Sequence, residues 1–540
     1  MLKASLAAVR ISASTSRKRR ISFRLGAALF LMQGWTSNYS WAQQARRIYS
    51  LTQSCRQSGE SSPEISHLLT VIAQRPSAEA YRSLGEAYGD RNELNCAILA
   101  FESSLRLDQK SWDTRYALAL ALIQAGDANR AASELRLIIG HQPDSLLAHN
   151  ALGLALESLG SFDAAAGEFK TALNLDPKFA LGYYNLAHVL TAEKRYAAAV
   201  FYLQKAVSLQ PDEPAYQLAL AAAYGQDQKF DQAIDLLRNL ISSHPDLPEA
   251  YFNLATAYTQ QKRYREAVEN YKQALRLNRQ NDFALLSLGK ALMGAGQPSE
   301  AVPVFQDYNR RLPNDFQGYL WLGQAFRNLG KYQDAQAQLD RAVQLNPDDY
   351  EARYNLGAVL VRLGNSAQAL PQLQAAEKLN SSDAQVHYQL ANILRRLGDQ
   401  KGAKQELQTF QTLEQKSGNK TKAASLQGQG NQFMDKGDPK SAAERYTEAL
   451  KLDPDNPRLH FNLSLALALM GNRQGQQAEL EKAIQLDPAL SQAYYRLGRL
   501  FMDLGKPAQA EQALTTAVAL DPANEQAQES LAALNDRQRK

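Results

Sequence analysis

The chain repeats itself every 34 residues, and this period limits the folds that are open to it. A small residue recurs at this spacing ten times without a slip, and each one directly follows a leucine. The ten residues are Gly85, Ala119, Gly153, Ala187, Ala221, Ala255, Gly289, Gly323, Gly357 and Ala391. The same register resumes at Gly430, Ser464 and Gly498, which gives thirteen units. A fixed period of this length is typical of stacked-repeat proteins, in which each unit packs against its neighbours.

Each unit is predicted to be a pair of helices. In residues 180–213, Tyr183, Leu186 and Leu190 recur at spacings of three and four, which predicts the apolar face of a first helix. A polar break follows, and then a second apolar series with the same spacing. Pro211 ends that second helix, because proline lacks an N–H and clashes with the preceding turn.

The pattern resembles the tetratricopeptide repeat family over about residues 78–524. Twelve of the thirteen units carry an alanine twelve residues after the small residue, and Gln476 is the exception. Gln429 alone replaces the leucine. The resemblance implies an all-α fold, a right-handed superhelical solenoid of about thirteen helix–turn–helix units. It also implies that the first helices line the concave face, through positions 2, 5, 6, 9, 12 and 13 of each unit.

The ends and one seam depart from the repeat. Residues 43–77 are predicted to form a degenerate N-terminal repeat before a ten-unit array at residues 78–410. The register then slips by five residues, so residues 411–422 are predicted to be an extended helix followed by a short linker. A three-unit array follows at residues 423–524. Residues 525–540 are predicted to be a closing helix and tail, since terminal repeats need a polar outer face.

The first 42 residues have the features of an export signal. They contain seven Lys and Arg and no acid, so this segment carries a charge of +7. Since the whole chain has a net charge of +5, the remaining residues carry −2. The basic run 17–20 precedes a short apolar segment, residues 25–32, and small residues stand at 40 and 42. We expect cleavage after Ala42 and export to the periplasm or out of the cell. An uncleaved anchor or a basic tail is the alternative, so membrane contact is expected only through this segment.

The nearly neutral remainder gives no reason to expect a nucleic-acid partner. The chain has two cysteines, Cys55 and Cys96. In an oxidising compartment they can form one disulfide. Two free, buried thiols fit the sequence equally well.

The sequence contains no motif of a known catalytic or phosphate-binding site, so we predict that the protein is not an enzyme and uses no cofactor. His149, His387 and His460 occupy the fourth position of their units, where the family places a large residue, and we interpret them as packing residues. No pair of histidines has the spacing of metal ligands, so no metal site is predicted.

Two sets of polar residues fall on positions that the family uses for its groove. The first set has a side-chain amide at position 6, which can both donate to and accept from a peptide backbone. It comprises Asn185, Asn253, Asn355 and Asn462. The second set lies in the units that start at 316, 350 and 384, and would form a positive strip suited to carboxylates. It comprises Arg327, Arg362, Arg395 and Arg396, with Asn392 nearby.

Each set has a second interpretation. Asparagine is also common at position 6 of generic repeats, and arginines can pair with neighbouring acids or keep the surface soluble. The leading hypothesis is an exported, non-enzymatic scaffold that binds protein or extended peptide partners in its concave groove and mediates complex assembly in the cell envelope. The positive strip would suit a partner with acidic groups. The alternative is an accessory component of polysaccharide export or glycosyl transfer. Aromatic residues at groove positions, namely Trp321, Phe252 and Tyr388, would favour that alternative.

Overall fold

A computed structural model describes residue 55 and residues 62–538. The expected signal, residues 1–42, lies outside the described residues. Of the predicted degenerate repeat, residues 43–54 and 56–61 also lie outside them. The described residues form 27 α-helices and no strand, which confirms the all-α prediction. None of these helices is both long and apolar enough to cross a membrane.

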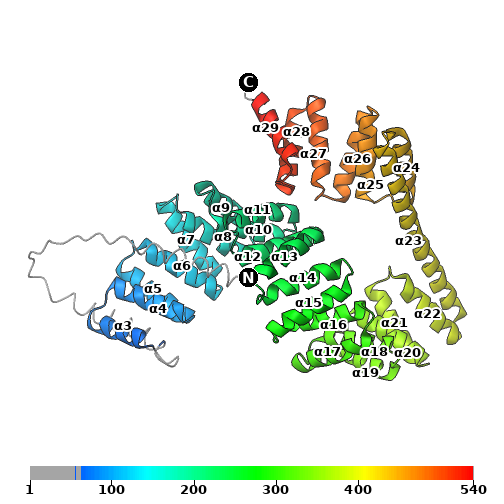
Figure 1. Ribbon diagram of the computed structural model, residues 1–540, viewed down its shortest axis with the longest axis horizontal. Helices are drawn as coiled ribbons and strands as arrows, with labels where there is room; N and C mark the ends of the chain where they lie inside the picture. Colours follow the sequence, from blue (N-terminus) through cyan, green and yellow to red (C-terminus); the bar gives the residue numbers. More distant parts are fainter. Residues whose placement is uncertain (1–54, 56–61, 539–540) are drawn as a thin grey trace, which may run out of the picture. The chain divides into compact units, whose positions relative to one another are not determined.

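The helices form successive hairpins, in which a first and a second helix lie side by side (Figure 1). The first helices are α4 (Ala78–Asp90), α6 (Trp112–Ala125), α8 (Leu146–Ser158), α10 (Ala180–Ala192), α12 (Pro214–Gln226), α14 (Pro248–Gln260), α16 (Asp282–Gly294), α18 (Phe316–Asn328), α20 (Tyr350–Arg362), α22 (Ala384–Arg396), α25 (Pro457–Leu469) and α27 (Ser491–Asp503). The second helices are α5 (Leu94–Leu107), α7 (Ala128–His141), α9 (Phe162–Leu175), α11 (Tyr196–Leu209), α13 (Phe230–Ser243), α15 (Tyr264–Leu277), α17 (Pro298–Arg311), α19 (Tyr332–Leu345), α21 (Ser366–Leu379), α24 (Pro439–Leu452), α26 (Arg473–Leu486) and α28 (Pro507–Leu520).

The small residue of each unit lets the two helices of a hairpin approach closely. In the α8–α9 hairpin, a Cβ atom on Gly153 would lie 2.5 Å from Cε1 of Phe169. Phe169 and Ala165, both on α9, are fully buried at this crossing. The period of glycine and alanine in the sequence is therefore a period of close helix crossings.

The turn between the two helices of a hairpin has a left-handed residue in every unit. Nine of these residues are glycines, which adopt a positive φ at no steric cost. The other four are Asn92, Lys194, Gln228 and Lys262, with φ near +60°. The turn therefore keeps one backbone shape whether or not its sequence favours it.

The chain divides into two compact units, Met1–Tyr216 and Gln217–Lys540, with the boundary inside α12. In the first unit, the described helices begin with α3 (Pro63–Gln74), which buries Ile65, Leu69 and Ile72 and packs against α4. In the second unit, the buried side chains form several successive clusters. Such local cores are expected where each repeat packs only on its neighbours.

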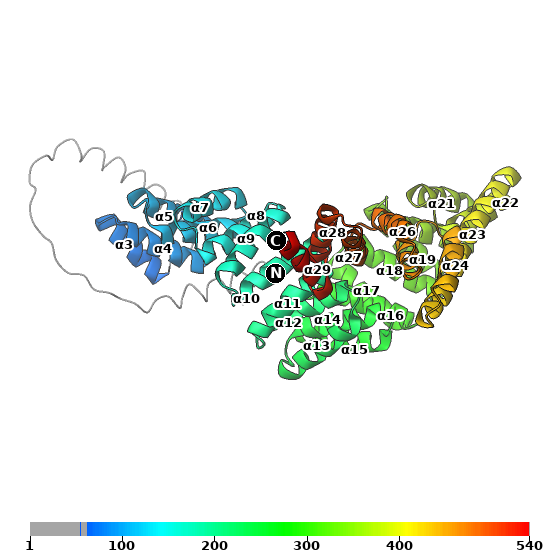
Figure 2. The same ribbon diagram turned by 90° about the horizontal axis from the view of Figure 1, so that it is seen from above.

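The seam of the repeat is one unbroken helix, α23 (Gln400–Asp435), of 36 residues. Its first turns complete the hairpin of α22, and its last turns pack on α24 as a first helix; Figure 2 shows the same helix from another side. Residues 411–422 are helical throughout, so the short linker expected after an extended helix is absent. The segment contains no proline, and six of its twelve residues are Gln, Lys or Glu, which favour helix.

The last helix, α29 (Glu525–Gln538), packs on α28 and buries Ala527 and Leu534. Most of its other described side chains are exposed or half-buried. It therefore covers the apolar end of the stack with a polar outer face.

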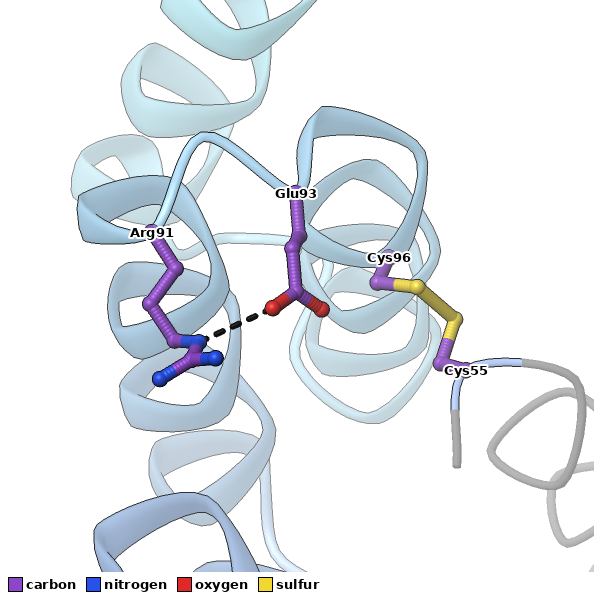
Figure 3. The surroundings of a disulfide bond; sticks show 4 residues. All are labelled: Cys55, Arg91, Glu93 and Cys96. Carbon is purple, nitrogen blue, oxygen red and sulfur yellow. Dashed lines mark hydrogen bonds and ion pairs between the residues drawn. A yellow bond between two sulfur atoms is a disulfide. The ribbon is translucent and has the colours of Figure 1, made fainter. Parts of the chain in front are cut away.

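Cys55 and Cys96 are joined by a disulfide, with their Cα atoms 5.7 Å apart (Figure 3). Cys96 lies in the first turn of α5, close to the turn in which Arg91 and Glu93 form an ion pair of 2.9 Å. The alternative of two free thiols therefore does not hold. The bond ties residue 55 to the first hairpin and closes a segment of 41 residues, which restricts the unfolded chain.

Candidate functional site

Within each compact unit, the first helices of several neighbouring hairpins contact one another. In the second unit, α18 contacts both α16 and α20, and α20 contacts α22. Residues at equivalent positions of these helices therefore recur along one face. The predicted cationic strip falls on α18, α20 and α22.

The four arginines of the strip lie in the last turns of these three helices. Cations are favoured there, because the carbonyl groups at a helix C-terminus carry partial negative charge. Arg362, Arg395 and Arg396 are exposed, and none of them pairs with an acid among the described residues. Arg395 donates a hydrogen bond of 3.0 Å to the half-buried Asn392 on the same helix.

Arg327 differs from the other three. It is half-buried and donates from its guanidinium to Oδ1 of Asn355 on the next first helix. Asn355 in turn donates to the backbone carbonyl of Glu351 at 2.7 Å. Arg327 therefore links α18 to α20, and only the other three arginines are open to a ligand.

The predicted asparagine set does not lie uniformly on an open surface. Asn185 is 1% exposed, and its Nδ2 donates to Oδ1 of Asn150 on α8 at 2.8 Å. Asn355 is 2% exposed. The expectation that these two amides face an open groove is therefore wrong, because each amide contacts a side chain of the preceding first helix, Asn150 or Arg327.

The other two asparagines are more accessible. Asn253, on α14, is half-buried. Asn462, on α25, is also half-buried and donates to Oδ1 of Asn431 on α23 at 3.2 Å. Amides at this position thus serve at least in part to join first helices, and their use by a peptide remains a prediction.

The three aromatic groove candidates divide in the same way. Trp321 is half-buried, stacked on Phe305, and lies under the ammonium group of Lys290. Phe252 is half-buried against Tyr271. Tyr388, on α22, is 42% exposed. Only Tyr388 therefore offers an open aromatic surface.

The histidines at position 4 are polar bridges instead of simple packing residues. In three hairpins the ring Nδ1 lies 2.5–2.6 Å from a glutamate oxygen on the second helix, nineteen residues later. The Nε2 atom donates to a backbone carbonyl of the preceding turn at 2.8–3.0 Å. The pairs are His149–Glu168, His387–Glu406 and His460–Glu479. The glutamate at i+19 is visible in the sequence and is the signal by which these bridges could have been found.

The bridges raise the pKa of two of the rings. The hydrogen bond from Glu479 is the main cause for His460, with burial opposing it and the Pro454 carbonyl adding to it. For His387, burial acts to lower the pKa, but the Glu406 carboxylate and the Ser381 carbonyl together outweigh it. Both rings therefore hold a proton more tightly than an exposed histidine does.

Comparison with known protein families identifies the repeat. Models described as tetratricopeptide repeat or TPR repeat match more than half of the chain. The matched residues are 116–178, 156–223, 214–257, 248–281, 286–335, 323–364, 354–413, 430–471, 457–490 and 477–534. No curated protein sequence matches the chain.

The solved structures to which the chain is similar have low sequence identity to it. The Cut9–Hcn1 hetero-tetramer of the APC/C is 15% identical, with 88% of this chain and 99% of that chain covered and a TM-score of 0.34. YrrB, described as a TPR protein with an unusual peptide-binding site, is 22% identical, with 40% and 94% covered and a TM-score of 0.26. PilF of Pseudomonas aeruginosa is 22% identical, with 39% and 96% covered and a TM-score of 0.34. These TM-scores are too low to carry an argument about function.

Proposed function

Because the chain belongs to the tetratricopeptide repeat family, whose fold is typical of protein–protein interaction, we propose that it is a non-enzymatic scaffold for an acidic partner segment. The binding surface consists of the three open arginines of the cationic strip, at the last turns of α20 and α22. They are Arg362, Arg395 and Arg396. The partner is a protein or an extended peptide that carries carboxylates.

The observation that carries this proposal is the exposure of three arginines without an acid partner. Elsewhere in the described chain, some arginines, such as Arg115 and Arg311, pair with carboxylates, and others, such as Arg341, are exposed without one. At the last turns of α20 and α22, three such arginines stand on neighbouring first helices. A guanidinium group binds a carboxylate through two parallel hydrogen bonds, which fixes the orientation of a ligand. Since the strip stands on packed helices, the protein loses little conformational entropy when a partner binds.

We also propose that the scaffold is exported. The basic and apolar segments of residues 1–42 support this, as does the disulfide between Cys55 and Cys96, because disulfides persist mainly in oxidising compartments. The polysaccharide alternative has less support, since Tyr388 is the exposed member of the three aromatic candidates.

Binding of a fluorescein-labelled polyglutamate peptide to the full chain tests the proposed surface, with polylysine of equal length as the control ligand. We expect the Arg362→Glu/Arg395→Glu variant to bind polyglutamate about tenfold or more weakly, because charge-assisted hydrogen bonds are lost. The matched control is Arg341→Glu/Lys404→Glu. It changes the net charge equally at exposed residues on α19 and on the second-helix part of α23.

Equal loss in both variants would mean that the peptide responds to net charge, and would contradict a site on α20 and α22. Unchanged binding in the Arg362/Arg395 variant would also contradict it. Circular dichroism of each variant checks that the helices are retained.

A further inference from the structure

One of the three histidine bridges has a second carboxylate beside it. His387 on α22, Glu406 on α23 and Glu377 on α21 each offer one ligand atom, and these atoms lie within 4.8 Å of one another. His387 is buried, and both glutamates are half-buried. Three consecutive helices thus bring one imidazole and two carboxylates together.

The imidazole is oriented for ligation by its contact with a backbone carbonyl. Nε2 of His387 lies 3.0 Å from the carbonyl oxygen of Ser381, which can only accept, so Nε2 carries the hydrogen. Without a metal, Nδ1 carries the second hydrogen and donates it to Oε2 of Glu406 at 2.6 Å. A metal ion that replaces this hydrogen would take the Nδ1 lone pair and the Glu406 carboxylate as ligands. Metal-ligating histidines commonly donate their other ring N–H to a carbonyl in this way, which fixes the tautomer.

Glu377 breaks the pattern of the repeat. The same position is apolar in ten of the thirteen units, and it is Ile139 and Leu450 beside the two other histidine bridges. Those two bridges therefore contain one carboxylate each, and the bridge at His387 contains two. A half-buried carboxylate at an otherwise apolar position needs a compensating partner.

The charges at this place favour a divalent cation. With a protonated His387, the two carboxylates leave one negative charge uncompensated. With a neutral His387 and a divalent ion, the charges cancel. One imidazole nitrogen and two carboxylate oxygens are ligands that Zn²⁺ accepts, and water can complete a tetrahedral shell.

We propose that Glu377, His387 and Glu406 form a zinc site that joins α21, α22 and the start of α23. Zinc ligands stand about 2.0–2.2 Å from the ion, so Nδ1 and Oε2 separate slightly from their hydrogen-bond distance when zinc enters. The sequence predicts no metal site because its ligands are ten and nineteen residues apart on three different helices. This proposal can fail or hold independently of the proposed peptide surface, because zinc binding is measured without a peptide.

Calorimetric titration of the untagged full chain with zinc chloride tests the site. We expect one binding event that is about tenfold or more weaker in Glu377→Leu, the variant that restores the residue found beside His460. Histidine-to-glutamine substitution at 387 should have the same effect. His460→Gln, which disrupts a bridge with a single carboxylate, should leave zinc binding unchanged.

The wild-type chain should also give a zinc absorption-edge spectrum with nitrogen and oxygen ligands and no sulfur. Absence of zinc binding by the wild type would overturn the proposal, as would equal binding by Glu377→Leu. Equal losses in His387→Gln and His460→Gln would overturn it too. If Glu377→Leu fails to fold, Glu377→Gln removes the charge with little change of shape and must show the same loss.

Discussion

Single residues decide how closely the helices of each hairpin pack. Gly153 stands against the ring of Phe169, where an added methyl group would lie 2.5–2.7 Å from three ring carbons. Gly167 lies on the second helix of the same hairpin and has nothing within 4 Å of the place where a Cβ would be. The two glycines therefore have opposite roles, although both lie in helices.

Substitution of each glycine by alanine separates these roles. Gly153→Ala should destabilise the hairpin by about 1–3 kcal/mol, because the core is overpacked. Gly167→Ala should stabilise it by about 0.5–1 kcal/mol, because alanine loses less entropy in a helix. Hydrogen exchange of α8 and α9 measures both effects locally. A stabilising Gly153→Ala would contradict the close crossing.

The histidine bridge at His460 predicts a dependence of stability on pH. Its pKa is raised in the folded protein, so the bridge stabilises fully below the unfolded pKa of about 6.5 and loses this contribution as pH rises through the folded pKa. The melting-temperature difference between the wild type and His460→Gln should therefore shrink from pH 6 to pH 9. A difference that stays constant or grows would contradict this assignment.

The face on which a side chain lies follows from the repeat register, but its partner does not. The sequence places Asn185 and Asn355 correctly on first helices. It does not show that Asn150 and Arg327, one hairpin earlier, reach them. Contacts of this kind depend on the distance between neighbouring first helices, which the period alone does not determine.

At the scale of helices, the seam at α23 is the least regular element. The sequence shows where the register slips, and the structure shows that one helix replaces the expected linker. The slip lies in a stretch without proline, where an exposed helix costs no packing, so the sequence allowed both outcomes. The middle of α23 is mostly exposed to solvent.

A distance measurement along α23 tests its continuity. Spin labels at Gln408→Cys and Gly428→Cys, both exposed, span twenty residues of the helix. Pulsed electron resonance should give a narrow distribution near about 30 Å, since a helix rises 1.5 Å per residue. A broad distribution would contradict a rigid helix and favour the linker. The same labels on a chain with Lys416→Pro provide the broken-helix control.

At the scale of the whole molecule, the repeat separates positions that pack from positions that are open to a partner. Positions that pack are nearly uniform along the chain, so the repeat register and the all-α fold can be predicted from the sequence. Positions on the first-helix face vary in residue type. On α20 and α22 they include three exposed arginines that pair with no acid among the described residues. Residue types alone did not separate Arg327, which joins two helices, from the three open arginines.

The central claim is that an acidic partner binds the first-helix face at α20 and α22. Tyr388 on α22 and Leu407 on the second-helix part of α23 are 42% and 41% exposed, so they form a matched pair for a benzophenone amino acid. With polyglutamate peptide in solution, photo-cross-linking should occur from residue 388 and be lost in Arg362→Glu/Arg395→Glu. Cross-linking of equal yield from residue 407, or from residue 388 in the variant, would contradict the claim.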